Sequence, residues 1–201
     1  GLYLIATFPS CHYDIEQYPA VKNYLLSFGI ERLEQTGKVH NINGNKVKAR
    51  KKTNNKWFET QDSISYWEDF SKPKIIYPNM TKYMPFVYDE IGFMTNQKCF
   101  IITGQNMAYL TAFFNSSLFK YCFRDSFPEL QGSTRELSKI FFDKIPIKQV
   151  SLEQNEIFRH IVASVQSDYT IEQMRSIDTM LFDLYNLTAE ERKTIDYVEI
   201  K

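Results

Sequence analysis

The stretch CFIITGQNMAYLTAFFNSSLFKYCF, residues 99–123, decides the fold class because it joins two different periodicities. Its first part, from Cys99 to Ile102, is short, apolar and rich in isoleucine, which is typical of a strand. From Gln105 to about Phe123, apolar residues recur at helical spacing, which predicts one helix with a single apolar face: Met107, Leu110, Phe114, Leu118 and Tyr121. Such an aromatic stripe indicates a core rather than a cofactor site. A chain with a strand-rich middle and a helical tail on either side of this stretch is expected to have an α+β fold.

A region rich in strand candidates precedes this stretch. Four segments have apolar or β-branched compositions that predict strands: 2–8, 57–61, 74–80 and 86–93. A helix is predicted from Pro19 to about Thr36, because proline suits a first helical turn and Gly37 suits a C-cap. We therefore predict a mixed-sheet domain over residues 1–150.

The tail, residues 151–201, differs in kind. Three hydroxyl residues are each followed three positions later by Gln or Glu, the capping-box pattern of a helix N-terminus: Ser151 with Gln154, Thr170 with Gln173, and Thr188 with Glu191. Apolar residues at helical spacing follow the first two. The tail is therefore predicted to form a helical hairpin that packs on the domain or on a catalytic part outside this sequence.

Charge is unevenly distributed along the 201 residues, although the formal net charge is zero. Residues 1–150 hold 19 Lys and Arg against 14 Asp and Glu, whereas residues 151–201 hold 5 against 10. The segment 38–56 contains no acid and seven cations: Lys38, Lys46, Lys48, Arg50, Lys51, Lys52 and Lys56. This composition is typical of a polyanion-binding segment, and equally of a solvated loop that keeps a protein soluble.

Several enzyme classes lack the residues that they require. The sequence has no glycine-rich phosphate-binding loop, its three histidines have no metal-ligand spacing, and no proline precedes an aspartate as in Pro-Asp nuclease motifs. Cys11 and His12 are neighbours that rarely face each other usefully, so an independent hydrolase is the weakest hypothesis. We predict no catalytic residues and no metal site in this chain.

The cysteines and the apolar runs bear on localisation. The three cysteines follow no disulfide spacing, which favours a reducing compartment. No apolar run approaches the ~18 residues of a membrane span. We expect a cytoplasmic protein without a membrane partner, and the start at Gly1 without Met suggests a fragment of a longer chain.

The order of several segments carries a family resemblance. These segments are YPAVKNYLLSFGIERLEQ (18–35), KWFETQ (56–61), KPKIIYPNM (72–80), FIITG (100–104), YLTAFFNSSLFKYCF (109–123) and STRELSKIFFDKIPI (133–147). In this order the chain resembles the C-terminal specificity, or target recognition, domain of adenine-specific DNA methyltransferases of the type IIG restriction-modification class. The ending IDTMLFDLYNLTAEERKTID (177–196) is similar to the helical ending of such enzymes.

The resemblance implies sequence-specific recognition of double-stranded DNA. The family's Asn/Asp-Pro-Pro-aromatic tetrapeptide and its glycine-rich turn for S-adenosylmethionine do not occur in this sequence. The resemblance therefore implies that this chain binds no cofactor, and that an N-terminal methyltransferase domain of the parent chain binds S-adenosylmethionine. Whether the parent also cleaves DNA stays open at this point.

DNA recognition requires phosphate contacts that position the protein and a few side chains that reach base edges. We assign a bidentate guanine contact to Arg50 and phosphate contacts to Lys51 and Lys52. Thr134 has a second interpretation, as the cap of a helix that begins near Arg135. The full set of candidate DNA-binding residues is Lys46, Lys48, Arg50, Lys51, Lys52, Lys56, Thr81, Lys82, Tyr83, Gln131, Ser133, Thr134 and Arg135.

Two other functions stay open on the sequence. The chain could be the DNA specificity subunit of a multisubunit restriction system, whose domains share this layout. Alternatively, the acidic helical tail could bind another protein while the basic segment is only solvated. Binding of duplex DNA at moderate salt distinguishes the second from the DNA-binding hypotheses.

Overall fold

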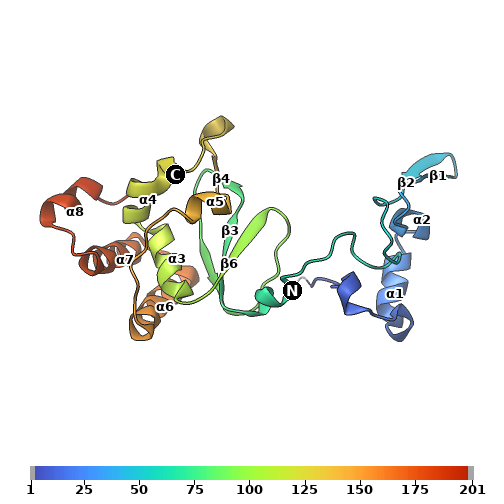
Figure 1. Cartoon of the computed structure of the whole chain (residues 1–201), viewed down its shortest axis with the longest axis horizontal. Helices are drawn as coiled ribbons and strands as arrows, with labels where there is room; N and C mark the ends of the chain where they lie inside the picture. Colours follow the sequence, from blue (N-terminus) through green and yellow to red (C-terminus); the bar gives the residue numbers. More distant parts are fainter. Residues whose placement is uncertain (1–2, 199–201) are drawn as a thin grey trace. The chain divides into compact units, whose positions relative to one another are not determined.

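The computed structural model describes residues 3–198, and the chain forms two compact units that divide after Trp67 (Figure 1). We call residues 3–67 the basic unit and residues 68–198 the aromatic unit. These units differ from the sequence-predicted domains, 1–150 and 151–201. The reason is that the tail helices share one hydrophobic core with the sheet and helices of residues 68–150.

The basic unit contains two short helices and one hairpin. Helix α1 spans Pro19–Leu26 and α2 spans Ile30–Leu33, and strands β1, Val39–Ile42, and β2, Asn45–Lys48, follow. The predicted single helix is interrupted at Gly29, whose φ of 88° leaves the helical region. The strands predicted at 2–8 and 57–61 are wrong for the described residues, because 3–8 have no regular secondary structure and 57–61 form turns and bends. Leu2 itself lies outside the described residues.

The β1–β2 hairpin was missed by the sequence analysis. Its strands are antiparallel, with Val39 opposite Lys48 and Ile42 opposite Asn45. Asn43 and Gly44 connect them with φ values of 51° and 81°. Two positive φ angles are the requirement of a type I′ turn, for which Asn-Gly is the preferred pair. The segment 38–48 is therefore an ordered ribbon rather than an irregular loop.

The aromatic unit contains two small sheets. In the larger, β3 (Lys74–Pro78) lies between β5 (Val87–Asp89) and β6 (Cys99–Thr103). In the smaller, β4 (Met80–Thr81) pairs with β7 (Arg135–Glu136). The α+β class is confirmed, but every strand pairing within residues 3–198 is antiparallel, so the sheets are not mixed.

The helices of the aromatic unit follow the predicted periodicity with one interruption. Residues 105–123 form two helices, α3 (Met107–Asn115) and α4 (Ser117–Phe123). Ser116 separates them, because its backbone is extended and its side chain accepts a hydrogen bond from the Phe119 N–H as the cap of α4. A short helix, α5, spans Lys139–Phe142. The tail then forms three helices, which are α6 (Leu152–Ser167), α7 (Ile171–Leu184) and α8 (Ala189–Ile195). All three predicted capping boxes are confirmed.

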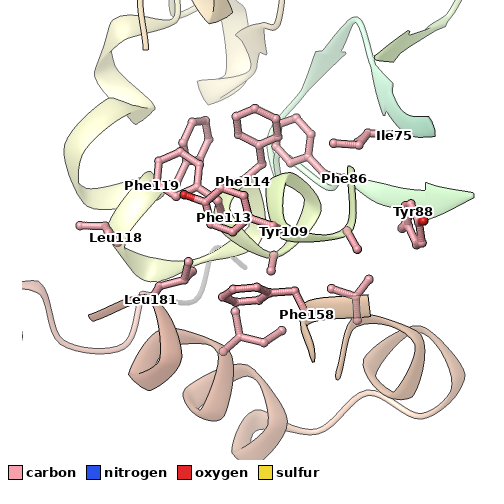
Figure 2. Close-up of a cluster of buried hydrophobic side chains, with 14 of the residues drawn as sticks. Ile75, Phe86, Tyr88, Tyr109, Phe113, Phe114, Leu118, Phe119, Phe158 and Leu181 are labelled. Atoms are coloured by element: carbon pink, nitrogen blue, oxygen red, sulfur yellow. The ribbon is translucent and has the colours of Figure 1, made fainter. Parts of the chain in front are cut away.

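Aromatic side chains fill the core of this unit. Figure 2 shows the α3 residues Tyr109 and Phe113 between Phe86 on the sheet side and Phe158 on α6. Phe113 and Phe119 are almost completely buried, and their ring centroids lie 5.6 Å apart. The tail therefore packs on the sheet-and-helix part of the same unit. Within residues 3–198, no helix combines the length and the apolar character needed to cross a membrane.

Candidate nucleic-acid interface

The hairpin of the basic unit has two different faces. Strand alternation places Asn41 beside Lys46 and Val39 beside Lys48 on one face, and all four side chains are exposed. We call these four residues the outer hairpin face. On the opposite face, Ile42, Val47 and His40 are half-buried, and His40 Nε2 lies 3.3 Å from Glu34 Oε2. The hairpin is thus attached through one face and presents lysines on the other.

Arg50, which the sequence analysis assigned to base reading, has a structural role instead. Its Nε donates to the Leu33 carbonyl at 2.8 Å, its Nη1 to the Glu59 carbonyl at 2.9 Å, and its Nη2 to the Trp57 carbonyl. Burial lowers the pKa of the Arg50 guanidinium. Three of its five N–H donors are therefore directed at carbonyls of its own unit, and the side chain holds this loop in place.

The side chain of Gln35 makes further hydrogen bonds to the loop at residues 50–60. The buried Gln35 donates from Nε2 to the Lys56 carbonyl at 2.9 Å and to the Glu59 carbonyl at 2.8 Å. Its Oε1 accepts a hydrogen bond from Thr53 Oγ1 at 2.6 Å. Arg50 and Gln35 therefore hold residues 50–60 against the turn that follows α2.

The remaining cations of the basic segment are exposed. Lys51 and Lys52 follow Arg50 directly, and neither side chain has an ion pair or hydrogen bond with any residue in 3–198. The same holds for Lys46 and Lys48 on the outer hairpin face. Lys56 lies over the Phe58 ring, 5.6 Å from its centroid. This arrangement leaves six exposed lysines of the segment 38–56 without an acidic partner among residues 3–198, which is suited to a polyanion.

In the aromatic unit, the structure brings together the two other groups of candidates. Strand β4 pairs with β7 so that Thr81 lies opposite Arg135. Tyr83 is exposed, and the Lys82 ammonium lies 5.7 Å from the centroid of its ring. Thr81 Oγ1 accepts a hydrogen bond from the Tyr83 N–H at 3.0 Å. Residues 81–83 and 131–135, which are distant in sequence, therefore form one surface region.

Arg135 itself belongs to the interior of this region. Its side chain is 9% exposed, Nη1 donates to the Phe127 carbonyl at 2.9 Å, and Nη2 lies 2.9 Å from Asp125 Oδ1. Glu129 is a second acidic partner at 3.3 Å. Like Arg50, Arg135 supports a loop rather than presenting its guanidinium outward.

The loop before Arg135 presents the remaining candidates. Gln131 and Ser133 are exposed, and both Gly132 and Ser133 have positive φ, at 74° and 60°. Thr134 does not cap a helix, because Arg135 continues into β7. Its Oγ1 donates to the Gln131 carbonyl at 3.0 Å. Thr134 closes this turn, while Gln131 and Ser133 are its exposed polar residues.

A cavity of about 310 Å³ lies next to Tyr83 in the aromatic unit. Tyr83 and Pro85 contribute to one wall, and residues of α3, α6 and α7 contribute to the others. Asn115 lines it, but its amide is hydrogen-bonded to the Phe86 carbonyl and N–H. Among residues 3–198, no group of three or more His, Cys, Asp or Glu side chains is arranged to hold a metal ion.

The outer hairpin face was not predicted from the sequence, and Asn41 was not among the predicted candidates. The dipeptide Asn43-Gly44 could have predicted the hairpin, because Asn-Gly is the strongest short-range sequence indication of a hairpin turn. With a two-residue turn fixed there, strand alternation alone would have placed Asn41 beside Lys46.

The exposed lysines without acidic partners among residues 3–198 give this α+β chain a surface suited to a polyanion. The family model of the TaqI-like C-terminal specificity domain matches residues 14–147, well over half of the chain. The chain belongs to this family, and the resemblance to C-terminal target recognition domains of restriction-modification enzymes is confirmed. The comparison with curated proteins found no match.

Proposed function

We propose that this chain is the sequence-specific double-stranded DNA recognition module of an adenine-specific DNA methyltransferase or of a fused type IIG restriction-modification enzyme. Membership of the specificity-domain family supports DNA sequence recognition. The module contributes recognition and no catalytic residues. An N-terminal methyltransferase domain of the parent chain would bind S-adenosylmethionine and take up the flipped adenine in the cytoplasm.

The observation that carries this proposal is the set of lysines without partners in the basic unit. Lys46, Lys48, Lys51 and Lys52 are exposed, and the segment 38–56 around them contains no acid. Lysines that neutralise phosphates release condensed counterions, which makes duplex binding favourable at low salt and weaker as salt rises. The acidic tail is unsuited to DNA contact, because its excess of carboxylates would be repelled by the phosphates.

The first experiment measures duplex binding by the full 201-residue chain across a salt series. The double substitution Lys51→Ala with Lys52→Ala should make the slope of log affinity against log salt shallower by up to about 2, because each phosphate contact contributes about 0.9. It should weaken all duplex sequences alike. The matched control is Lys144→Ala with Lys193→Ala, two exposed lysines of the aromatic unit, which should leave the slope unchanged.

An unchanged slope and affinity for the Lys51 and Lys52 double variant would reduce this segment to a solubility feature. The DNA surface would then have to include Lys82 and the loop at Gln131. Failure of the wild-type chain to bind duplex DNA at low salt would instead favour a protein-interaction domain over either DNA-binding role.

A second experiment tests the absence of catalysis. The chain alone, incubated with labelled S-adenosylmethionine and duplex DNA, should transfer no methyl group, because it lacks the residues that this reaction requires. It should likewise cleave no DNA when Mg²⁺ is supplied. Methyl transfer by the chain alone would overturn its assignment as a recognition module.

A further inference from the structure

We propose that the β1–β2 hairpin enters the major groove as a two-stranded ribbon, with its outer hairpin face against the bases, and that Asn41 reads an adenine. This inference rests on the proposed function and adds to it the groove, the reading element and the reading residue. It transfers base reading from Arg50, whose guanidinium is hydrogen-bonded to three backbone carbonyls of its own unit, to a residue outside the sequence-predicted set.

The size and shape of the hairpin fit this role. A major groove about 12 Å wide admits a two-stranded β-ribbon. The register pairs four residues of β1 with four of β2, and the turn at Asn43 and Gly44 adds no bulky side chain at the tip. The segment contains no acid that would be repelled by phosphates. A ribbon that is positively charged along one face can therefore follow the groove.

The outer face carries the hydrogen-bonding groups that base reading needs. The Asn41 side chain is exposed and makes no hydrogen bond with any residue in 3–198, so its amide donor and acceptor are both available. Asparagine forms a bidentate contact with N6 and N7 of adenine in the major groove. Lys46 is directly opposite Asn41, and opposite residues have Cβ atoms about 4.5 to 5.5 Å apart. The pair can thus contact neighbouring base pairs.

The exposed Val39 on the same face has no role in the core. Its side chain is 59% exposed, although it is β-branched and lies on a face otherwise occupied by polar residues. An apolar side chain in the major groove contacts the thymine methyl group. Val39 and Asn41 therefore provide two complementary means of recognising A·T base pairs, and Lys46 and Lys48 provide positive charge beside them.

The base of the hairpin is held firmly enough to position these groups. The Ala49 N–H donates to the Lys38 carbonyl at 2.9 Å, and the Gly37 N–H donates to the Arg50 carbonyl at 2.8 Å. Arg50 N–H in turn donates to the Glu34 carbonyl at 2.9 Å. Both ends of the hairpin, at residues 37–38 and 49–50, are therefore hydrogen-bonded to each other and to the backbone beside the Arg50 side chain. A reading residue positioned in this way needs little ordering when DNA binds.

The test compares Asn41→Ala with Asn45→Ala in the full chain. Asn45 is also exposed and lies on the other face of the same hairpin, so it is a matched control. Each protein selects duplexes from a pool with a randomised central segment, and binding to the duplex preferred by wild type is then measured across a salt series. Thermal melting by circular dichroism establishes that all three proteins are folded.

We expect Asn41→Ala to lose about 5- to 150-fold in affinity for the preferred duplex and to relax selection at one A·T position. Its salt slope should match that of wild type, because asparagine neutralises no phosphate. Replacing the adenine at that position by 7-deazaadenine, which lacks the N7 acceptor, should weaken wild type and leave Asn41→Ala unaffected. Asn45→Ala should behave as wild type.

Unchanged selection by Asn41→Ala, or relaxed selection by Asn45→Ala in its place, would overturn the inference while the proposed function stands. Sensitivity of Asn41→Ala to 7-deazaadenine equal to that of wild type would overturn the adenine contact. Absence of any duplex binding by the wild-type chain would overturn the proposed function itself, and the inference with it.

Discussion

Different interactions stabilise the interior of the basic unit and the interior of the aromatic unit. In the basic unit, the buried apolar side chains among the described residues are Phe8, Ile15, Ala49 and Phe58. Its loops depend instead on hydrogen bonds from Arg50 and Gln35 to backbone carbonyls. In the aromatic unit, a continuous core joins the sheet, α3, α4 and the tail helices.

The difference shows how stability is distributed in each unit. Apolar burial is non-directional and is shared among many contacts, so an aromatic core combines many moderate contributions. A guanidinium has five donors in a fixed fork, so one arginine can fix three segments of backbone at once. The basic unit can thus have an open, hydrophilic surface, but its conformation depends on a few polar side chains.

The largest expected effect lies in the aromatic core. Phe119 is fully buried and contacts the rings of Phe113, Phe114 and Phe127. Phe119→Ala should lower the free energy of unfolding of the aromatic unit by about 3 to 5 kcal/mol, because it leaves a cavity. Urea denaturation measures this. Phe93→Ala is the control, since Phe93 is 61% exposed and its loss should change stability by about 0.5 kcal/mol or less.

Arg50→Lys should give the next largest effect, confined to the basic unit. Lysine cannot reproduce the guanidinium fork, so acceptors among the Leu33, Trp57 and Glu59 carbonyls lose their partner, at a cost of about 1 to 3 kcal/mol. Hydrogen exchange of residues 33–59 should accelerate while the aromatic core stays protected. Arg32→Lys, at an exposed position without a side-chain partner in residues 3–198, serves as control. Equal exchange in both variants would show that Arg50 does not hold the unit.

Thr188→Ala tests whether a polar contact also matters within the aromatic unit. Thr188 Oγ1 accepts a hydrogen bond from the Glu191 N–H at 3.3 Å and caps α8. Its removal should lower stability by about 0.5 to 2 kcal/mol, measured by thermal unfolding. Thr194→Ala, inside α8, should not be destabilising, because Thr194 only bonds back to the Glu190 carbonyl. If both variants behaved alike, the capping box would have no measurable role.

The smallest expected effect concerns a carboxylate in the aromatic core. Burial raises the pKa of Asp178 above its ordinary value of 3.8, although the Ser117 N–H and hydroxyl donate hydrogen bonds to it and oppose this shift. The unfolded chain therefore loses this proton more readily than the folded protein. Stability from this group should fall as pH rises from 3.8 through the raised pKa. Asp178→Asn should remove this pH dependence of the free energy of unfolding, which urea denaturation at a series of pH values measures. A pH dependence of stability parallel to that of wild type would contradict the prediction.

Local patterns in the sequence predicted much of the aromatic unit. The isoleucine-rich runs at 74–78 and 99–103 are strands, and all three capping boxes begin helices, because these signals depend on neighbouring residues. The break at Ser116 was not predicted, since the apolar periodicity continues across it. The capping serine was visible, but only the packed structure shows that α3 ends there.

The basic unit was harder to predict for a physical reason. A guanidinium can donate equally to phosphates, base edges or backbone carbonyls, so the sequence around Arg50 does not distinguish a reading arginine from a structural one. The carbonyls that it binds come from residues 33, 57 and 59, and only the folded chain brings them together. Lys46, Lys48, Lys51 and Lys52 are exposed in the structure, and their assignment to DNA contacts stays a prediction.

The alternation of faces along the β1–β2 hairpin has an evolutionary consequence. The residues that fix its register and attachment are Ile42, Val47 and the Asn43-Gly44 turn, whereas Asn41 and Lys46 contribute no buried contact. Surface substitutions of this kind usually change stability by about 0.5 kcal/mol or less. Lineages can therefore exchange the side chains at positions 41 and 46 freely while keeping the same scaffold, so new target preferences can arise by single steps without an intermediate that fails to fold.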